Sequence, residues 1–253
     1  MCGRRVGAAV VAAAVCFLCG WCLSSRTVLA GDDDDISHLI LFSGRDLWRN
    51  GLFSYGGLIL SPGGFDQSGF LLKAMMSGGI YRYDASNLGG AEVIGIEYLT
   101  QVAPGFLLKR DHFEGKFFFG PEWRTNWLWP DDPDNRLRGH TRGLQFATEL
   151  WFEPTPQTML AGDASLSSID ITFTARLAYG WHVNELFDTI DFYTGPETQL
   201  YGGDGYRQWR FGLHVTSMKT GNAEWSAAGG WSIDSDRRSS PYVRLNLLQR
   251  ILN

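Results

Sequence analysis

The feature that most constrains this chain is a strict alternation of apolar and polar side chains, repeated in about twelve short segments. In the segment 171–181, one side carries Ile171, Phe173, Ala175, Leu177, Tyr179 and Trp181. The positions between them are mostly small or polar. A period of two indicates an extended strand whose two faces meet different environments. Because Gly, Pro, Asp or Asn ends each segment, the pattern predicts an all-β protein.

Residues 1–30 have the pattern of a secretory signal peptide. Arg4 and Arg5 precede an apolar stretch over 6–23, and Val28-Leu29-Ala30 forms a small-residue cleavage site. The apolar stretch is long enough that an uncleaved membrane anchor is the alternative. We expect cleavage, with residues 31–253 forming one exported domain.

All four cysteines, Cys2, Cys16, Cys19 and Cys22, lie in this leader. The spacing of the last three resembles a thiolate metal motif, but a cleaved leader would remove them. We therefore expect no disulfide and no thiol chemistry in the exported domain.

Charge and composition limit the kinds of protein that the exported domain can be. The formal net charge of −5 becomes −8 without the leader, which holds three arginines and no acid. This acidic balance argues against a nucleic-acid partner. Outside the leader, no stretch approaches the length of a spanning helix. Abundant glycine, phenylalanine and tryptophan fit a barrel with aromatic girdles. These features predict an antiparallel up-and-down transmembrane β-barrel that contacts outer-membrane lipid.

We expect about twelve strands, with ten as the alternative if weak segments merge. They lie near 37–44, 47–61, 68–83, 91–102, 112–127, 139–153, 156–166, 169–182, 189–200, 205–219, 222–234 and 239–251. An even number places both chain ends at the same end of the barrel. The short turns at 153–156 and 219–222 then lie at the periplasmic end. The longest connection, from Trp129 to Thr141, faces outward.

The alternation also assigns the two faces of each strand. The expected lipid face includes Leu144, Phe146, Leu150, Phe152, Trp209, Phe211, Leu213, Val215, Trp225, Trp231, Ile233, Val243, Leu245 and Leu247. A charge on this face would cost about 2–4 kcal/mol near the bilayer midplane, so the charged positions are expected inside. The expected interior includes Glu97, Lys116, Glu122, Arg124, Glu149, Asp163, Arg176, Glu197, Arg210, Glu224 and Arg244.

A polar network in the lumen follows from this assignment. Its candidate members are Glu149, Asp163, Arg176, Arg210 and Arg244. These charges either pair across a filled interior or line a polar pathway. We favour pairing, because a barrel of this size has limited free space inside.

Six stretches, in order along the chain, resemble the BcsS family of cellulose-biosynthesis proteins. They are FSGRDLW at 42–48, GGLILSPGG at 56–64, GIYRY at 79–83, WFEPTP at 151–156, YTGPE at 193–197 and GYRQWR at 205–210. The resemblance implies an outer-membrane barrel that works with cellulose synthase components and assists synthesis or export of the glucan. It supplies no catalytic residues.

Three tryptophans cluster where a strand meets the long outer connection. Aromatic faces can stack on glucose rings, so Trp123, Trp127 and Trp129 are the candidate glucan contacts. The alternative, which we favour, is the interfacial aromatic belt of a membrane barrel.

Enzymatic chemistry finds little support in the sequence. Of the five histidines (His38, His112, His140, His182 and His214), only His214 sits firmly within a strand. A lone interior histidine is more typical of a structural residue than of a catalytic triad. Glu149 and Asp163 lie on neighbouring strands, as a glycosidase pair would, but other carboxylates could meet equally well.

Acidic clusters at 32–35 and at Asp131, Asp132 and Asp134 lack the spacing of a calcium loop, so we expect no metal and no cofactor. Together these observations predict a non-enzymatic barrel that assists glucan secretion or surface anchoring. The partners would be a cellulose chain and components of the synthase complex. A lipid-modifying barrel enzyme and a small passive pore are the alternatives.

Overall fold

A computed structural model describes residues 36–186, 190–203, 206–235 and 238–251 of the chain. The predicted signal peptide and the acidic run at 32–35 lie outside these residues. The described part contains no helix that is long and apolar enough to cross a membrane.

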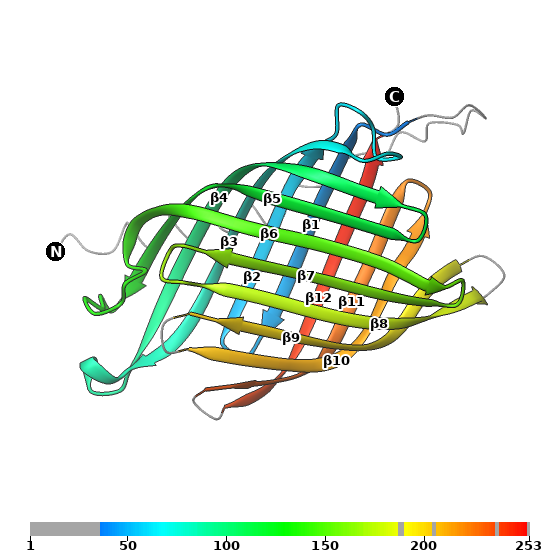
Figure 1. The fold of residues 1–253 in the computed structure, drawn as a ribbon. Helices are drawn as coiled ribbons and strands as arrows, with labels where there is room; N and C mark the ends of the chain where they lie inside the picture. Colours follow the sequence, from blue (N-terminus) through cyan, green and yellow to red (C-terminus); the bar gives the residue numbers. More distant parts are fainter. Residues whose placement is uncertain (1–35, 187–189, 204–205, 236–237, 252–253) are drawn as a thin grey trace. The chain divides into compact units, whose positions relative to one another are not determined.

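In the described residues, twelve antiparallel strands follow one another along the chain, with a short 3-10 turn at Ser86–Leu88 between the third and the fourth (Figure 1). The strands are β1 (Leu39–Trp48), β2 (Gly51–Leu60), β3 (Gly69–Ala85), β4 (Ala91–Arg110), β5 (Phe113–Trp129), β6 (Gly139–Thr155), β7 (Thr158–Ser167), β8 (Phe173–Leu186), β9 (Ile190–Gly202), β10 (Arg207–Thr220), β11 (Ala223–Asp234) and β12 (Ser239–Ile251). The prediction of an all-β barrel with twelve strands is confirmed, and the alternative of ten is wrong.

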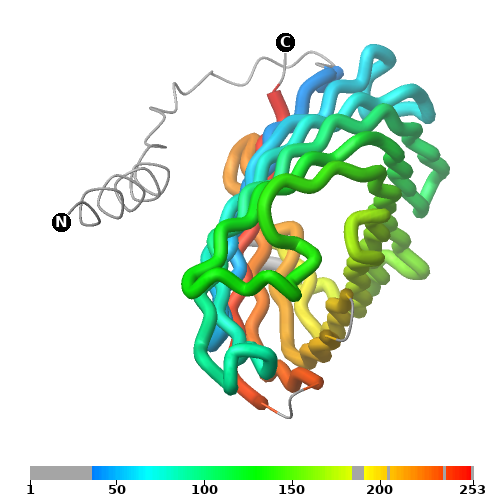
Figure 2. The backbone as a smooth tube through the Cα atoms, turned by 90° about the vertical axis from the view of Figure 1, so that its left-hand side faces the viewer, coloured from blue at the N-terminus to red at the C-terminus, as the bar shows by residue number. Residues whose placement is uncertain are grey.

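The sheet closes on itself because its first and last strands pair. Leu39 of β1 lies opposite Ile251 of β12, and Trp48 lies opposite Tyr242 at the other end of the same ladder. Every other pair joins sequence neighbours, so the order around the wall is the order along the chain. The blue and red strands that meet in Figures 1 and 2 mark this closure. Closure gives each strand a paired neighbour on both sides, which is how a sheet can span a membrane.

Connections alternate between two ends of the barrel. We call the end that holds Leu39 and Ile251 the terminal end, where β4 meets β5, β6 meets β7 and β10 meets β11. We call the opposite end the loop end. It carries the connection at 130–138 between β5 and β6, green in Figure 2.

Side-chain exposure follows the predicted alternation. Outward positions such as Phe146, Leu213 and Trp231 are strongly exposed, although they are apolar. Inward positions such as Arg210 and His214 are buried despite their polarity. A wall that is apolar outside and polar inside is the arrangement of a transmembrane barrel, whose outer surface contacts lipid.

Boundaries of the first, second, fourth and eighth predicted strands were wrong by several residues. The first strand does not end at 44 but continues to Trp48, because Asp46 faces inward and finds a cationic partner there. The chain turns instead at Arg49-Asn50, just before Gly51, where an Asn-Gly pair suits a tight turn. The second strand begins at Gly51 rather than 47.

The fourth strand does not end at 102 but continues to Arg110, because Pro104 and Gly105, which resemble a turn, lie within the sheet opposite Leu72 and Leu71. The eighth strand begins at Phe173 rather than 169, because Asp170 and Ile171 adopt positive φ values of 52° and 47° in the preceding turn.

Candidate functional site

The inner wall near the terminal end carries an apolar cluster. Its buried members are Ile40, Ile59, Phe65, Leu71, Ala103, Leu107, Phe118 and Ala147. All but Phe65 belong to strands β1 to β6. Phe65 comes from the β2–β3 connection, whose backbone is held by bonds from Phe65 N–H to the Ser37 carbonyl and from Lys109 Nζ to the Phe65 carbonyl. This half of the terminal end is therefore packed with side chains.

One cation lies directly against this cluster. The ammonium group of Lys73 lies 4.8 Å from the ring centre of Phe118 and 5.3 Å from that of Phe42. The same group donates to Glu149 Oε1 at 2.7 Å. Because β3 and β6 are not neighbours in the wall, this ion pair joins two separate parts of the inner surface.

A second group of charges centres on Glu197, whose side chain is fully buried. Its Oε2 lies 2.7 Å from an Arg244 nitrogen and 3.5 Å from an Arg176 nitrogen, and its Oε1 accepts from the Tyr242 hydroxyl at 2.9 Å. Arg176 is also paired with Asp163 on the neighbouring strand. Glu197 therefore holds β8, β9 and β12 together inside the barrel.

Arg210 is a nearly fully enclosed cation of the interior, with 1% of its side chain exposed. One of its terminal nitrogens donates to both carboxylate oxygens of Asp46, at 2.8 and 2.7 Å. The guanidinium carbon lies 4.8, 4.6 and 5.0 Å from the ring centres of Trp48, Tyr201 and Tyr242. Such a cage suits a cation, because aromatic faces are electron-rich.

The five residues predicted to form a lumen network all face inward but fall into separate groups. Arg176, Asp163 and Arg244 join through Glu197. Glu149 lies opposite Asp163 in the β6–β7 register but is paired with Lys73, and Arg210 pairs with Asp46. Lys73 and Asp46 were absent from the predicted interior. Lys73 follows two leucines, and Asp46 fell in the misplaced turn.

Sequence reasoning missed a row of four inward-facing aromatic side chains near the loop end. Ring centres of Trp48 and Phe53 are 5.7 Å apart, with 14° between the planes. Phe53 and Tyr81 follow at 6.4 Å and 24°, then Tyr81 and Tyr83 at 6.1 Å and 18°. The signal was available, because Tyr81 and Tyr83 alternate with Arg82 and so share a face.

The outer end of this row is tied to the β5–β6 connection. The Tyr83 hydroxyl donates to Asp132 Oδ2 at 2.7 Å, and the Asn87 amide donates to Asp132 Oδ1 at 2.8 Å. Asn135 Nδ2 donates to the Tyr83 hydroxyl at 2.8 Å. The bond from Tyr83, with those from Asn87 and the backbone, lowers the pKa of Asp132 below its ordinary value.

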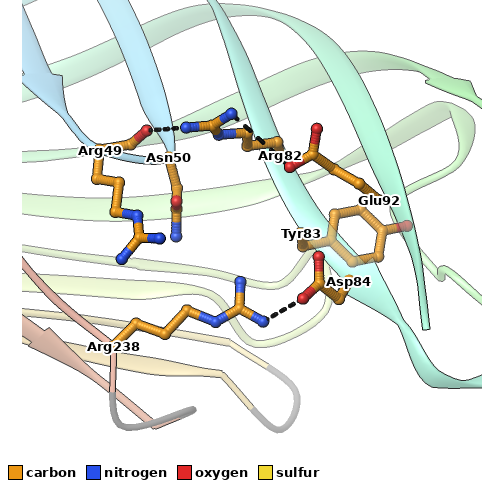
Figure 3. Close-up of a pocket in the computed structure, with 7 residues that line it drawn as sticks. All are labelled: Arg49, Asn50, Arg82, Tyr83, Asp84, Glu92 and Arg238. Atoms are coloured by element: carbon orange, nitrogen blue, oxygen red, sulfur yellow. Dashed lines mark hydrogen bonds and ion pairs between the residues drawn. The ribbon is translucent and has the colours of Figure 1, made fainter.

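A cavity of about 310 Å³ lies at the rim beside Tyr83 (Figure 3). Its lining includes three arginines and two acids. Arg82 lies 3.7 Å from Glu92 and donates to the Arg49 carbonyl, while Arg238 pairs with Asp84. Apart from Tyr83, most of this lining is charged, which distinguishes it from the aromatic row.

The three tryptophans predicted to contact glucan lie on the outer wall. Trp123, Trp127 and Trp129 are 45%, 52% and 77% exposed. They lie on the same face of β5, and Trp127 packs edge-on against Tyr98 of β4 at 5.6 Å. This position, near the strand ends and facing away from the lumen, is typical of an interfacial aromatic belt.

His214, considered for catalysis, and Asp131, considered for metal binding, are both engaged in structural contacts. His214 is buried, and its ring nitrogens contact the Thr216 hydroxyl at 2.9 Å and the Tyr179 carbonyl at 3.1 Å. Asp131 is paired with Arg138 in the β5–β6 connection. Within the residues that the structure describes, no three His, Cys, Asp or Glu side chains come close enough together to hold a metal ion.

Solved structures of outer-membrane barrels share this fold at low sequence identity. The COG4313 outer membrane channel from Pseudomonas putida F1 aligns with a TM-score of 0.53 and 12% identity, over 88% of this chain and all of that one. The beta domain of the Bordetella autotransporter BrkA aligns with a TM-score of 0.51 and 9% identity, over 86% and 100%. The KdgM porin in complex with disordered oligogalacturonate aligns with a TM-score of 0.44 and 11% identity, over 84% and 99%.

No curated protein matches the sequence. The family model for the cellulose biosynthesis protein BcsS, in contrast, matches residues 40–251, from the first strand to the last. With the whole barrel covered by that match, the chain belongs to the BcsS family.

Proposed function

We propose that the protein is a non-enzymatic accessory of cellulose biosynthesis in the outer membrane, where it assists secretion of the glucan or its retention at the cell surface. The observation that carries this proposal is the family match over the entire barrel. The fold supports this location, because a closed barrel with an apolar outer wall suits a membrane.

The interior supports a binding or structural role rather than a reaction. Several of its carboxylates form close ion pairs, as Glu149 does with Lys73 and Asp46 does with Arg210, while Glu97 and Glu122 share Arg124 at 3.8 Å each. A general acid or nucleophile must be held beside a reacting bond in a defined protonation state. These ion pairs instead tie strands together across the lumen.

The test compares a strain with a clean deletion of the gene to its parent. Extracellular cellulose is measured by dye binding and as acid-insoluble glucose, alongside synthase activity in isolated membranes. We expect less extracellular glucan at normal synthase activity. Unchanged glucan would contradict a role in secretion or retention. Analysis of lipid A and phospholipid acylation in the same strain tests the alternative of a lipid-modifying enzyme.

Contact between the polymer and the outer tryptophans is a separable part of the proposal. If they contact emerging glucan, replacing Trp127 and Trp129 by alanine should lower matrix retention without lowering the amount of barrel. Equal retention would leave these side chains with the interfacial role that their exposure favours.

A further inference from the structure

We propose that Trp48, Phe53, Tyr81 and Tyr83, which we call the aromatic row, form a binding surface for a chain of neutral pyranose sugars. The choice of β-linked glucan as the occupant rests on the proposed function. The binding surface itself rests on the geometry of the inner wall.

The rings lie against the wall because each of the first three faces a glycine on the neighbouring strand. Phe53 lies opposite Gly79, and Tyr81 lies opposite Gly95. A Cβ atom on Gly79 would come within 2.4 Å of the Phe53 ring, and one on Gly95 within 2.4 Å of the Tyr81 ring. Each glycine thus makes room for a ring to cover the backbone.

Trp48 repeats this arrangement at the inner end of the row. It lies opposite Gly51, where a Cβ atom would come within 2.7 Å of the indole. All four aromatic side chains are only partly buried. Phe53, Tyr81 and Tyr83 cover the wall and keep part of their surface accessible, so they form a platform along the inner surface. The Trp48 ring, which also carries the Arg210 guanidinium, forms the inner end of this platform.

The distances between the rings of the platform suit the stacking of successive sugar rings. Adjacent ring centres lie 5.7 to 6.4 Å apart, and adjacent planes differ by no more than 24°. In a β-linked glucose chain the hydroxyls lie at the edges of each ring, so the ring faces present C–H groups. Those groups carry partial positive charge and pack against the electron-rich face of an aromatic ring.

Polar groups at the edge of the row match the hydroxyls of such a chain. Asn126 Nδ2 donates to the Tyr81 hydroxyl at 2.5 Å, and Asp132 accepts from Tyr83. Amide, carboxylate and phenol groups together offer both donors and acceptors, which a sugar hydroxyl requires.

Charge selects a neutral sugar over an acidic one at the inner end of the row. The cation beside Trp48 is Arg210, whose charge is already matched by Asp46 and enclosed by three rings. To pair with Arg210, the carboxylates of a uronic acid chain at this position would have to displace Asp46. At the outer end, Tyr83 also borders the rim cavity (Figure 3).

The experiment measures binding of cellohexaose to the purified full-length mature barrel in detergent micelles by isothermal titration calorimetry. The test variant is Phe53→Leu with Tyr81→Leu, which removes two aromatic faces but keeps apolar bulk. The matched control is Trp127→Leu, which removes an aromatic face from the outer wall. Circular dichroism and the faster gel migration of an unheated barrel verify folding of each protein.

We expect the wild type and Trp127→Leu to bind cellohexaose equally, and the double variant to bind about tenfold more weakly or not at all. The acidic hexagalacturonate should bind the wild type more weakly than cellohexaose. Absence of cellohexaose binding by the wild type, or equal binding by the folded double variant, would overturn the inference.

Failure of this inference and failure of the proposed function are distinguishable. Binding without any change of glucan in the deletion strain would leave the saccharide site standing and remove its assignment to cellulose secretion. Reduced glucan in the deletion strain without cellohexaose binding would support the role in cellulose secretion and remove the saccharide site.

Discussion

The buried ion pair between Asp46 and Arg210 gives the sharpest test of how the barrel interior is stabilised. Replacing Asp46 by alanine removes the bidentate partner and leaves a charge on a side chain that is 1% exposed. Loss of one partner from a buried pair costs about 3–5 kcal/mol, because the remaining charge is neither paired nor hydrated. The three ring faces remain, and cation–π contacts of about 0.5–2 kcal/mol each keep the cost near the lower value.

The reverse substitution should cost less. Arg210→Met removes the cation, fills the cage with an apolar side chain, and leaves Asp46 with 14% of its side chain exposed to water. In the double variant, Asp46→Ala with Arg210→Met, neither charge is left buried alone. Its loss of unfolding free energy should therefore be about 1–3 kcal/mol smaller than the sum of the losses in the two single variants.

The assay is equilibrium unfolding in guanidinium, followed by tryptophan fluorescence, with the barrel in lipid vesicles. The matched control is Asp131→Ala, which breaks the ion pair between Asp131 and Arg138 at the rim. The side chains of this pair are largely exposed, 58% for Asp131 and 49% for Arg138. An exposed pair contributes about 0–1 kcal/mol. If Asp46→Ala costs no more than Asp131→Ala, the account of Arg210 as a buried, matched charge is refuted.

Three further predictions concern the loop, the wall and the lipid face. Because hydrogen bonding lowers the pKa of Asp132, its contribution to stability is complete above the ordinary aspartate pKa of about 3.9 and is lost as the pH falls through the lowered value. Limited proteolysis of the 130–138 connection should therefore rise only below that pH, and Asp132→Asn should raise it at neutral pH. Gly79→Ala should displace the Phe53 ring and destabilise the barrel by about 1–3 kcal/mol, measured by unfolding, whereas Gly69→Ala, with open space around the new methyl, should not. Leu213→Arg, at a position that is 66% exposed on the outer wall, should cost about 2–4 kcal/mol in lipid vesicles, and an unchanged midpoint would place this residue outside the bilayer.

Much of the barrel wall follows from the sequence alone. A side chain points to alternate faces at each step of a strand, so local alternation decides which residues meet lipid and which face inward. Glu149 and Arg210 were assigned to the interior in this way. Turn residues bounded the strands to within a few positions in most cases. They failed at Asp46, where a polar pair inside a strand resembles a turn.

The arrangement of the interior was decided only by the closed barrel. Alternation shows that a side chain faces the lumen, but not its height on the wall or what lies across from it. Lys73 and Glu149 are 76 positions apart, and Asp46 and Arg210 are 164 apart. Their meeting depends on the pairing register of several strands and on the closure of β1 with β12.

The aromatic row depends on the same long-range geometry. The sequence places Phe53 and Gly79 on separate strands, and nothing local to either shows that they lie opposite each other. The family and the barrel fold could thus be predicted from the sequence, because both depend on local patterns and on their order along the chain. The candidate site was not, because its rings and ion pairs come together only when the register of the closed sheet is set.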